Sequence, residues 1–263
     1  MIIKQIWVDN YLRNFNYLIA CSETGDAIAI DPLDHKTCVE LAEKNHWKIK
    51  YIFNTHEHSD HISGNTKVVN KTGAKIIANK YLKSKISNID YAIGAGDIIR
   101  VGNQVKFECL DTPGHTLNHM SLLSRNDQPA LFAGDALFNA GAGNCKNGGD
   151  PNKLFETFEN QFDLIDENTV IYPGHDYMIS NLEFTLYIEP NNKSAASILK
   201  KIRNQDPSNP FLTTIKIEKE INVFFRLNNP SIISKIKEKF PELGEITDRR
   251  IIFIKLRELR DQW

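Results

Sequence analysis

Seven side chains of the kinds that bind metal ions stand at the ends of apolar runs in this sequence. The segment THEHSDH follows the apolar run KIKYIF and supplies His56, His58, Asp60 and His61. In an extended chain His56 and His58 point to the same side, and Asp60 and His61 follow at a turn. Neighbouring imidazoles and a carboxylate need either solvent or a cation, because burying them without partners is costly. The segment therefore predicts a metal site.

Three later segments share one pattern, in which an apolar run is followed by a glycine and then directly by a residue that can bind a metal ion. They are LDTPGHT with His115, LFAGDALF with Asp135 and VIYPGHDY with His175. Rigid scaffolds present chemistry on loops at strand ends, so we expect the four ends to converge. A catalytic zinc takes about three protein ligands, whereas two ions about 3.5–4 Å apart accommodate seven. The pattern predicts a dinuclear centre.

The elements that must position these residues alternate up to about residue 175. Short β-branched or aromatic runs such as YLIACS, AIAIDP, QVKFECL and ALFAGD predict strands. Residues 35–47 and 64–73 predict helices, the second closed by Gly73. Beyond this point the pattern is helical, with Pro190 separating two helices and two further helical segments after residue 229.

We therefore predict two closely packed parts, a catalytic domain over residues 1–175 and a mostly helical substrate-binding domain over 176–263. Hydrophobic residues make up 41% of the chain and charged residues 25%, which is typical of a globular protein. The net charge of −1 gives no whole-chain attraction to nucleic acid or to anionic membranes. Charges at Lys4, Asp9 and Arg13 interrupt the N-terminal segment, which does not resemble a signal peptide. We expect a cytoplasmic monomer with a small-molecule partner, no nucleic acid and no membrane.

The motifs THEHSDH, PGHT, AGDALF and PGHDY together resemble the metallo-β-lactamase superfamily. The resemblance implies an α+β fold, an αββα sandwich with a dinuclear site at one edge of its sheets, here followed by a smaller helical domain. It also implies the ligand sets: His56, His58 and His115 for one ion, Asp60, His61 and His175 for the other, and Asp135 as the bridge. We expect two divalent ions, zinc first, with iron or manganese as alternatives, since imidazole and carboxylate suit all three.

Three further segments are similar to the glyoxalase II family of hydroxyacylglutathione hydrolases. GDALFNAGAGNCKNGG resembles the glutathione-contacting loop, GHDYMISNLEFTLYIEPNN the domain junction, and KLRELRDQW the basic C-terminal helix. The resemblance implies that Tyr177, Arg257 and Arg260 contact glutathione, and the planar fork of arginine suits carboxylates. Asn144 and Lys146 depart from the family, which carries a cation and an aromatic residue there, and we expect both to be among the substrate-binding residues. We expect Lys146 to supply the missing cation.

The expected reaction is hydrolysis of S-D-lactoylglutathione by a metal-held hydroxide, with Asp60 and Asp135 as the catalytic carboxylates. The leaving thiolate has a conjugate-acid pKa of about 8.5, so no strong general acid is needed. His119 is either a partner of a metal ligand or a structural strand histidine. Three alternatives stay open: another hydrolase of this fold, such as a lactonase, lactamase or general thioesterase, a glutathione persulfide dioxygenase with one iron, and a metal-binding module without activity.

Overall fold

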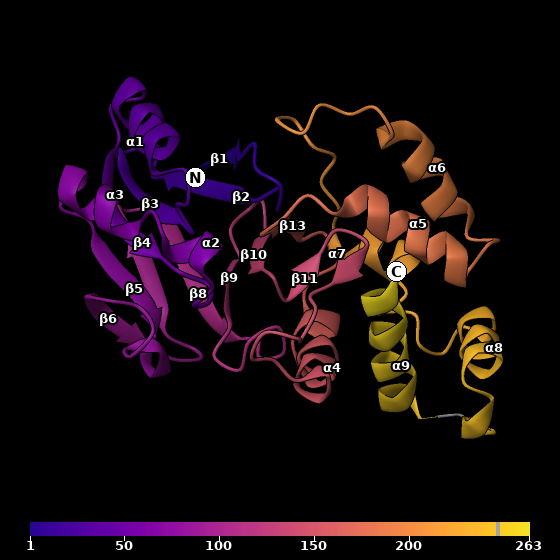
Figure 1. Ribbon diagram of the computed structural model, residues 1–263. Coiled ribbons are helices and arrows are strands. Elements are labelled where there is room, and N and C mark those ends of the chain that lie inside the picture. Colours follow the sequence, from indigo (N-terminus) through magenta and orange to yellow (C-terminus); the bar gives the residue numbers. More distant parts are fainter. Residues whose placement is uncertain (246–247) are drawn as a thin grey trace.

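The computed structural model describes residues 1–245 and 248–263, and its first part contains two β-sheets (Figure 1). The first sheet has the spatial order β1 (Ile2–Trp7), β2 (Phe15–Ala20), β3 (Asp26–Ile30), β4 (Lys48–Phe53), β5 (Lys75–Asn79) and β6 (Ile89–Ile93). The second has the order β13 (Val170–Pro173), β10 (Ala130–Gly134), β9 (Met120–Ser124), β8 (Val105–Asp111) and β7 (Ile98–Val101). A small hairpin of β11 (Leu137–Phe138) and β12 (Gly141–Ala142) follows β10.

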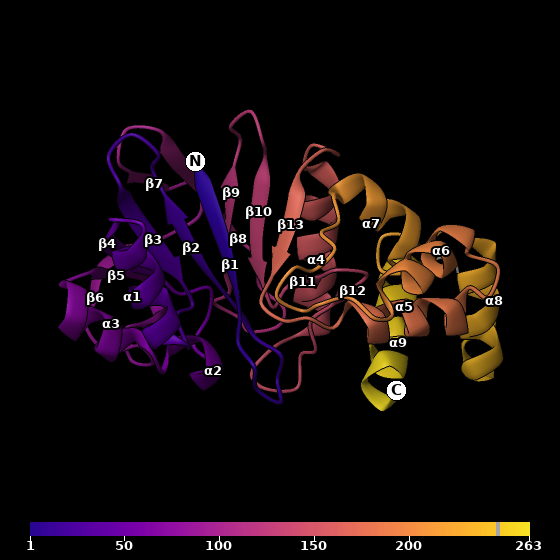
Figure 2. The same ribbon diagram turned by 90° about the horizontal axis from the view of Figure 1, so that it is seen from above.

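The two sheets pack face to face and each is covered by helices on its outer side (Figure 2). Helices α1 (His35–Lys44) and α3 (Asn65–Thr72) cover the first sheet, and α4 (Pro151–Asn160) covers the second. Between the sheets, the ring of Tyr17 on β2 packs edge to face on Phe132 of β10, with centroids 5.3 Å apart. Gly73 ends α3 in the left-handed conformation, as its sequence position predicts. The predicted αββα sandwich is therefore confirmed.

Beyond residue 176 the described chain is mostly helical, and the sequence pattern predicts its α-helices except the one at Ile215–Ile221. The helices are α5 (Met178–Ile188), α6 (Lys193–Ile202), α7 (Ile215–Ile221), α8 (Pro230–Lys239) and α9 (Arg249–Gln262). Helices α5, α7, α8 and α9 share one apolar core with α4, in which the rings of Phe158 and Phe253 lie 5.2 Å apart. Helix α6 packs with α5 and α7 in a second apolar cluster. None of the helices within the described residues is long and apolar enough to cross a membrane.

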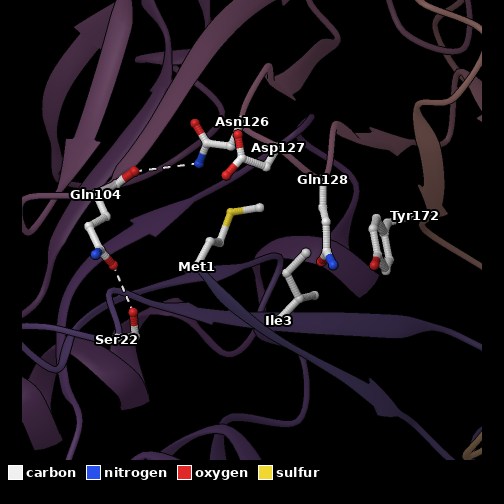
Figure 3. A pocket seen from close by; sticks show the side chains of 8 residues that line it. All are labelled: Met1, Ile3, Ser22, Gln104, Asn126, Asp127, Gln128 and Tyr172. Atoms are coloured by element: carbon white, nitrogen blue, oxygen red, sulfur yellow. Dashed lines mark hydrogen bonds between the residues drawn. The ribbon is translucent and has the colours of Figure 1, made fainter.

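The two ends of the sandwich differ in character. At one end, hydrogen bonds join the sheets where Met120 donates to the carbonyl of Thr55 and Phe15 donates to that of Gly174, at 2.8 Å each. The other end opens on a pocket of about 740 Å³, lined by polar side chains of the turns such as Gln104 (Figure 3). Every residue of the predicted metal site follows the strand ends at the first, closed end.

Candidate metal centre

Three imidazoles meet just past the ends of β4 and β8 and form what we call the first group. The Nε2 atoms of His56 and His115 each lie 3.0 Å from Nδ1 of His58. The first two residues of THEHSDH to carry an imidazole thus face the same side, as an extended backbone requires. The potential ligand atoms of the three side chains lie within 4.8 Å of one another, which is close enough to share one ion.

The second group consists of Asp60 and His61 on the short helix α2 (Ser59–Ile62) and His175 just past β13. Nε2 of His61 lies 3.4 Å from Oδ2 of Asp60 and 3.3 Å from Nε2 of His175. Nε2 of His175 is 3.5 Å from the same Asp60 oxygen. These atoms form a second compact donor set from segments that are more than 110 residues apart.

Asp135, directly after β10, lies between the two groups. Its Oδ2 atom is 3.4 Å from Nε2 of His115 in the first group and 3.1 Å from Nε2 of His175 in the second. Its Oδ1 atom is 3.5 Å from Nε2 of His61. The structure therefore brings all seven predicted ligands together, with one carboxylate in reach of both donor sets.

The outward ring nitrogen of each of the five imidazoles faces an oxygen atom. The pairs are His56 with Thr55 Oγ1 (3.0 Å), His58 with Asn147 O (3.0 Å), His61 with Asp31 Oδ2 (2.9 Å), His115 with Asn144 O (2.7 Å) and His175 with Leu12 O (2.7 Å). Carbonyl and carboxylate oxygens only accept hydrogen bonds, and the Thr55 hydroxyl already donates to Asp31. The outward nitrogens therefore carry the protons, and the inward nitrogens present lone pairs.

Inward lone pairs about 3 Å apart repel one another, and only cations between them relieve this. Burial lowers the pKa of His56 well below its usual value and also lowers that of His115, so both imidazoles are neutral donors. Burial also acts to lower the pKa of His61, but the carboxylates of Asp135 and Asp31 outweigh it and favour positive charge there. At Nε2 of His61 that charge is either a proton or a bound ion in its place. In the described chain, the buried Oδ1 of Asp135 accepts no hydrogen bond. The donor set thus fits two metal ions.

Two supporting residues were not found from the sequence. Asp31 directly follows β3 and is buried, with its backbone at a φ of +47°. Its carboxylate accepts hydrogen bonds from Thr55 N (2.9 Å) and Thr55 Oγ1 (2.6 Å), and from Nδ1 of His61. The amide of Asn14 donates to Oδ2 of Asp60 at 3.0 Å. The run AIAIDP did carry a signal for Asp31, since a polar side chain again follows an apolar strand.

His119 supports a metal ligand and is not one itself. Its Nδ1 lies 2.8 Å from the hydroxyl of Thr112, and its Nε2 accepts from the backbone N–H of Asp135 at 3.1 Å. A Cβ atom on Gly134 would lie only 2.6 Å from that Nε2. Of the two interpretations of His119, the structure favours a partner that positions Asp135.

The predicted substrate residues Tyr177 and Arg260 lie on the side of the site that faces the helical part. The ring of Tyr177 stacks on that of His175, with centroids 5.0 Å apart and planes inclined by 7°. Arg260 on α9 is part-buried and donates to Ser180 Oγ at 3.0 Å and to Asn181 Oδ1 at 3.2 Å. A ligand between Tyr177 and Arg260 would connect the metal site to the last helix.

Arg257 and Lys146, which we expected to contact the substrate, both form hydrogen bonds to other residues of the protein. Arg257 is only 5% exposed, donates to the carbonyl of Ala142 at 2.6 Å and pairs with Asp261 at 2.9 Å. Lys146 is exposed, and its Nζ donates to the carbonyl of Asp261 at 3.0 Å. The Asn144 side chain accepts from Lys146 N. The side chain of Lys146 therefore contacts α9 in this structure. Substrate contacts of Arg257, Asn144 and Lys146 stay predictions.

Comparisons with known proteins give two family matches that together span most of the chain. The family described as "Metallo-beta-lactamase superfamily" matches residues 14–175, and "Hydroxyacylglutathione hydrolase C-terminus" matches residues 176–263. A hydroxyacylglutathione hydrolase of Nitrosococcus oceani is 53% identical over 263 residues and the whole of both chains. One of Arabidopsis thaliana, named cytoplasmic, is 33% identical over 95% of each chain.

Among solved structures, ETHE1 from Myxococcus xanthus superposes with a TM-score of 0.68 over 99% of this chain and 98% of its own. Its sequence is 23% identical, so this likeness supports the fold alone. The fold, with its cluster of His and Asp side chains, indicates a dinuclear metal site.

Proposed function

The chain belongs to the hydroxyacylglutathione hydrolase family of the metallo-β-lactamase superfamily, and we propose on that basis that it hydrolyses S-(2-hydroxyacyl)glutathione thioesters. The substrate we propose is S-D-lactoylglutathione, which gives glutathione and D-lactate in the second step of methylglyoxal detoxification. The observation that carries the proposal is a full-length relative at 53% identity together with a family-specific C-terminal part.

Zinc is the metal that we propose for both groups, because neutral imidazoles and carboxylates are its usual ligands in catalytic sites. The first group would hold one ion and the second group the other, with Asp135 shared between them. When bound, two such ions would lower the pKa of a water toward about 7 and polarise a substrate carbonyl. Iron or manganese in the purified protein would correct the metal without changing the ligand sets.

Binding and orienting the thioester is the task that we assign to the side chains around the metal groups. Burial, together with the charges of Asp135 and Asp60, raises the pKa of Tyr177 to about 12, so its phenol stays protonated and can donate. The guanidinium of Arg260 would offer Nη1 to a glutathione carboxylate, since its Nε and Nη2 already donate to Asn181 and Ser180. A thiolate leaves readily, so no further proton donor is required of the chain.

We propose a monomer as the working unit. We also propose a cytoplasmic location, as the name of the Arabidopsis relative states for that protein.

The test of this function is the initial rate of S-D-lactoylglutathione hydrolysis by the metal-replete protein. Asp135→Ala should abolish the reaction because it removes the carboxylate that both groups share. Asp90→Asn is the matched control, since Asp90 is a carboxylate on β6 that pairs with Lys75 away from the strand ends of the site. Two bound ions without hydrolysis of this thioester would show that the proposed substrate is wrong.

A further inference from the structure

Residues 139–143, which include β12, are held by side chains of the helical part. Figure 2 shows this hairpin between the second sheet and α5. Each of the five residues has a main-chain atom in such a bond: Asn139 O from Asn181 Nδ2 (3.0 Å), Ala140 N to the Glu218 carboxylate (3.0 Å), Gly141 O from Asn222 Nδ2 (3.1 Å), Ala142 O from Arg257 Nη1 (2.6 Å) and Gly143 O from Arg257 Nη1 (3.2 Å). We call residues 139–143 the clamped segment.

Glu218 on α7 is the most unusual member of this set, because it is a fully buried carboxylate. Besides Ala140 N, it accepts from Thr213 Oγ1 at 2.6 Å and from Asn222 Nδ2 at 2.7 Å. Within the described residues, these hydrogen-bonding partners are all uncharged. Burying a carboxylate without a cation is costly, and an apolar side chain at this position would fill the protein core at a lower cost in free energy. A role at the clamped segment accounts for its presence.

Ala140 shows how firmly this contact shapes the segment. Its backbone adopts a φ of +60°, in a region that residues other than glycine rarely occupy. The N–H of Ala140 lies 3.0 Å from both carboxylate oxygens of Glu218. Strained backbone of this kind persists where the surroundings determine it, and here the surroundings are the helical part.

The clamped segment leads directly into the carbonyls that orient the first metal group. Asn144 O accepts from Nδ1 of His115, and Asn147 O accepts from Nε2 of His58. These two imidazoles are two of the three donors of that group. A shift of the segment would therefore turn both rings.

The second group has its supports elsewhere. His175 donates to Leu12 O, His61 donates to Asp31, and Asp60 accepts from Asn14. In the described structure all three supporting groups come from residues before β4. The hydrogen bonds that orient the two metal groups therefore come from different parts of the chain, and the contact of the second group nearest to the clamped segment is an edge-to-face packing of Phe138 on His175.

We propose that Glu218 is a positioning residue for the first metal group, acting through the clamped segment and the carbonyls of Asn144 and Asn147. The helical part then helps to build the metal site in addition to any contact with substrate. The inference rests on the proposed function only in requiring that the two groups bind metal ions.

The test is a calorimetric titration of the metal-depleted chain with Zn²⁺ at pH 8, comparing Glu218→Ala with the wild type. Loss of a group that orients ligands typically costs 10–100-fold in metal affinity. We expect one ion to bind as in the wild type and the other about tenfold more weakly. Variants His58→Ala and His175→Ala serve as references for damage to the first and the second group, and Glu218→Ala should match the first.

Glu189→Gln is the matched control for general damage to the helical part. Glu189 is also buried, and it pairs with Arg226 at 2.9 Å without contacting the clamped segment. If Glu218→Ala folds poorly, Glu218→Gln replaces it in the test. Glutamine keeps the side-chain volume and the hydrogen bond from Ala140, but its amide N–H faces one of the donors, Thr213 or Asn222. It should therefore lower the affinity for the same ion, by a smaller factor.

Two results would overturn the proposal: wild-type affinity for both ions in the Glu218 variants, or equal weakening of both ions that Glu189→Gln reproduces. Failure of the proposed function looks different. In that case the wild type would bind two ions and Glu218→Ala would show the selective loss of affinity, yet the wild type would not hydrolyse S-D-lactoylglutathione.

Discussion

Replacing Asp31 by asparagine tests how the second metal group is oriented. Asp31 is 2% exposed, and its two oxygens accept from the N–H and hydroxyl of Thr55 and from Nδ1 of His61. Asparagine has the same shape but replaces one acceptor by a donor. In either amide orientation its NH₂ group faces at least one donor of Thr55 or His61.

These contacts set the expected losses of metal affinity and of unfolding free energy in Asp31→Asn. When the amide NH₂ faces His61, the imidazole satisfies it best by moving its proton from Nδ1 to Nε2, the atom that points at Asp60 and His175. The ligand nitrogen then becomes a donor and can no longer bind an ion. We expect the ion of the second group to bind about 10–100-fold more weakly, which is about 1.4–2.8 kcal/mol. The metal-free chain should lose about 1–3 kcal/mol of unfolding free energy for a buried donor left unpaired.

The assay is the same Zn²⁺ titration, with urea unfolding of the metal-free chain beside it. Asp34→Asn is the control, because Asp34 caps α1 through the backbone N–H of Thr37 and asparagine caps helices equally well. The reasoning is refuted if Asp31→Asn binds both ions with wild-type affinity, or if the ion of the first group is the one weakened.

Three further predictions concern the backbone near Asp135, the substrate and the buried carboxylate. Gly134→Ala should lower the unfolding free energy by about 2–5 kcal/mol, since its φ is +51° and its Cβ would lie 2.6 Å from Nε2 of His119; a loss below about 0.5 kcal/mol in urea unfolding would contradict this. Lys146→Ala should raise the KM for S-D-lactoylglutathione about two- to fivefold with kcat unchanged, the size of one exposed charge contact; an unchanged KM would show that Lys146 does not replace the missing cation. Burial raises the pKa of Glu218 from about 4.5 to about 7, against hydrogen bonds from Thr213, Ala140 and Asn222. The folded chain therefore holds this proton more tightly than the unfolded one, and the stability of the wild type relative to Glu218→Gln should fall by about 3 kcal/mol as pH rises from about 4.5 to about 7 and stay level above it; a difference independent of pH in chemical unfolding would contradict this.

The sequence alone was enough to predict the class of fold and to name seven residues that the structure gathers into one cluster. His56, His58 and Asp135 stand at strand ends in types and spacings that have few uses other than binding a cation, so local pattern was sufficient. The structure brings these residues together with the other four predicted ligands. The helical second part was also readable, because amphipathic periodicity is a local property.

Only the tertiary structure showed what orients those ligands. The acceptors of His115 and His175 are the carbonyls of Asn144 and Leu12, and every residue has a carbonyl, so no sequence pattern marks them. Arg257 reads as an open cation in the sequence, whereas the fold buries it against the carbonyl of Ala142. No sequence motif marks Glu218, and long-range packing makes it a buried partner of the clamped segment. Residue type determined which atoms can bind a metal, and contacts between distant segments decided which way those atoms point.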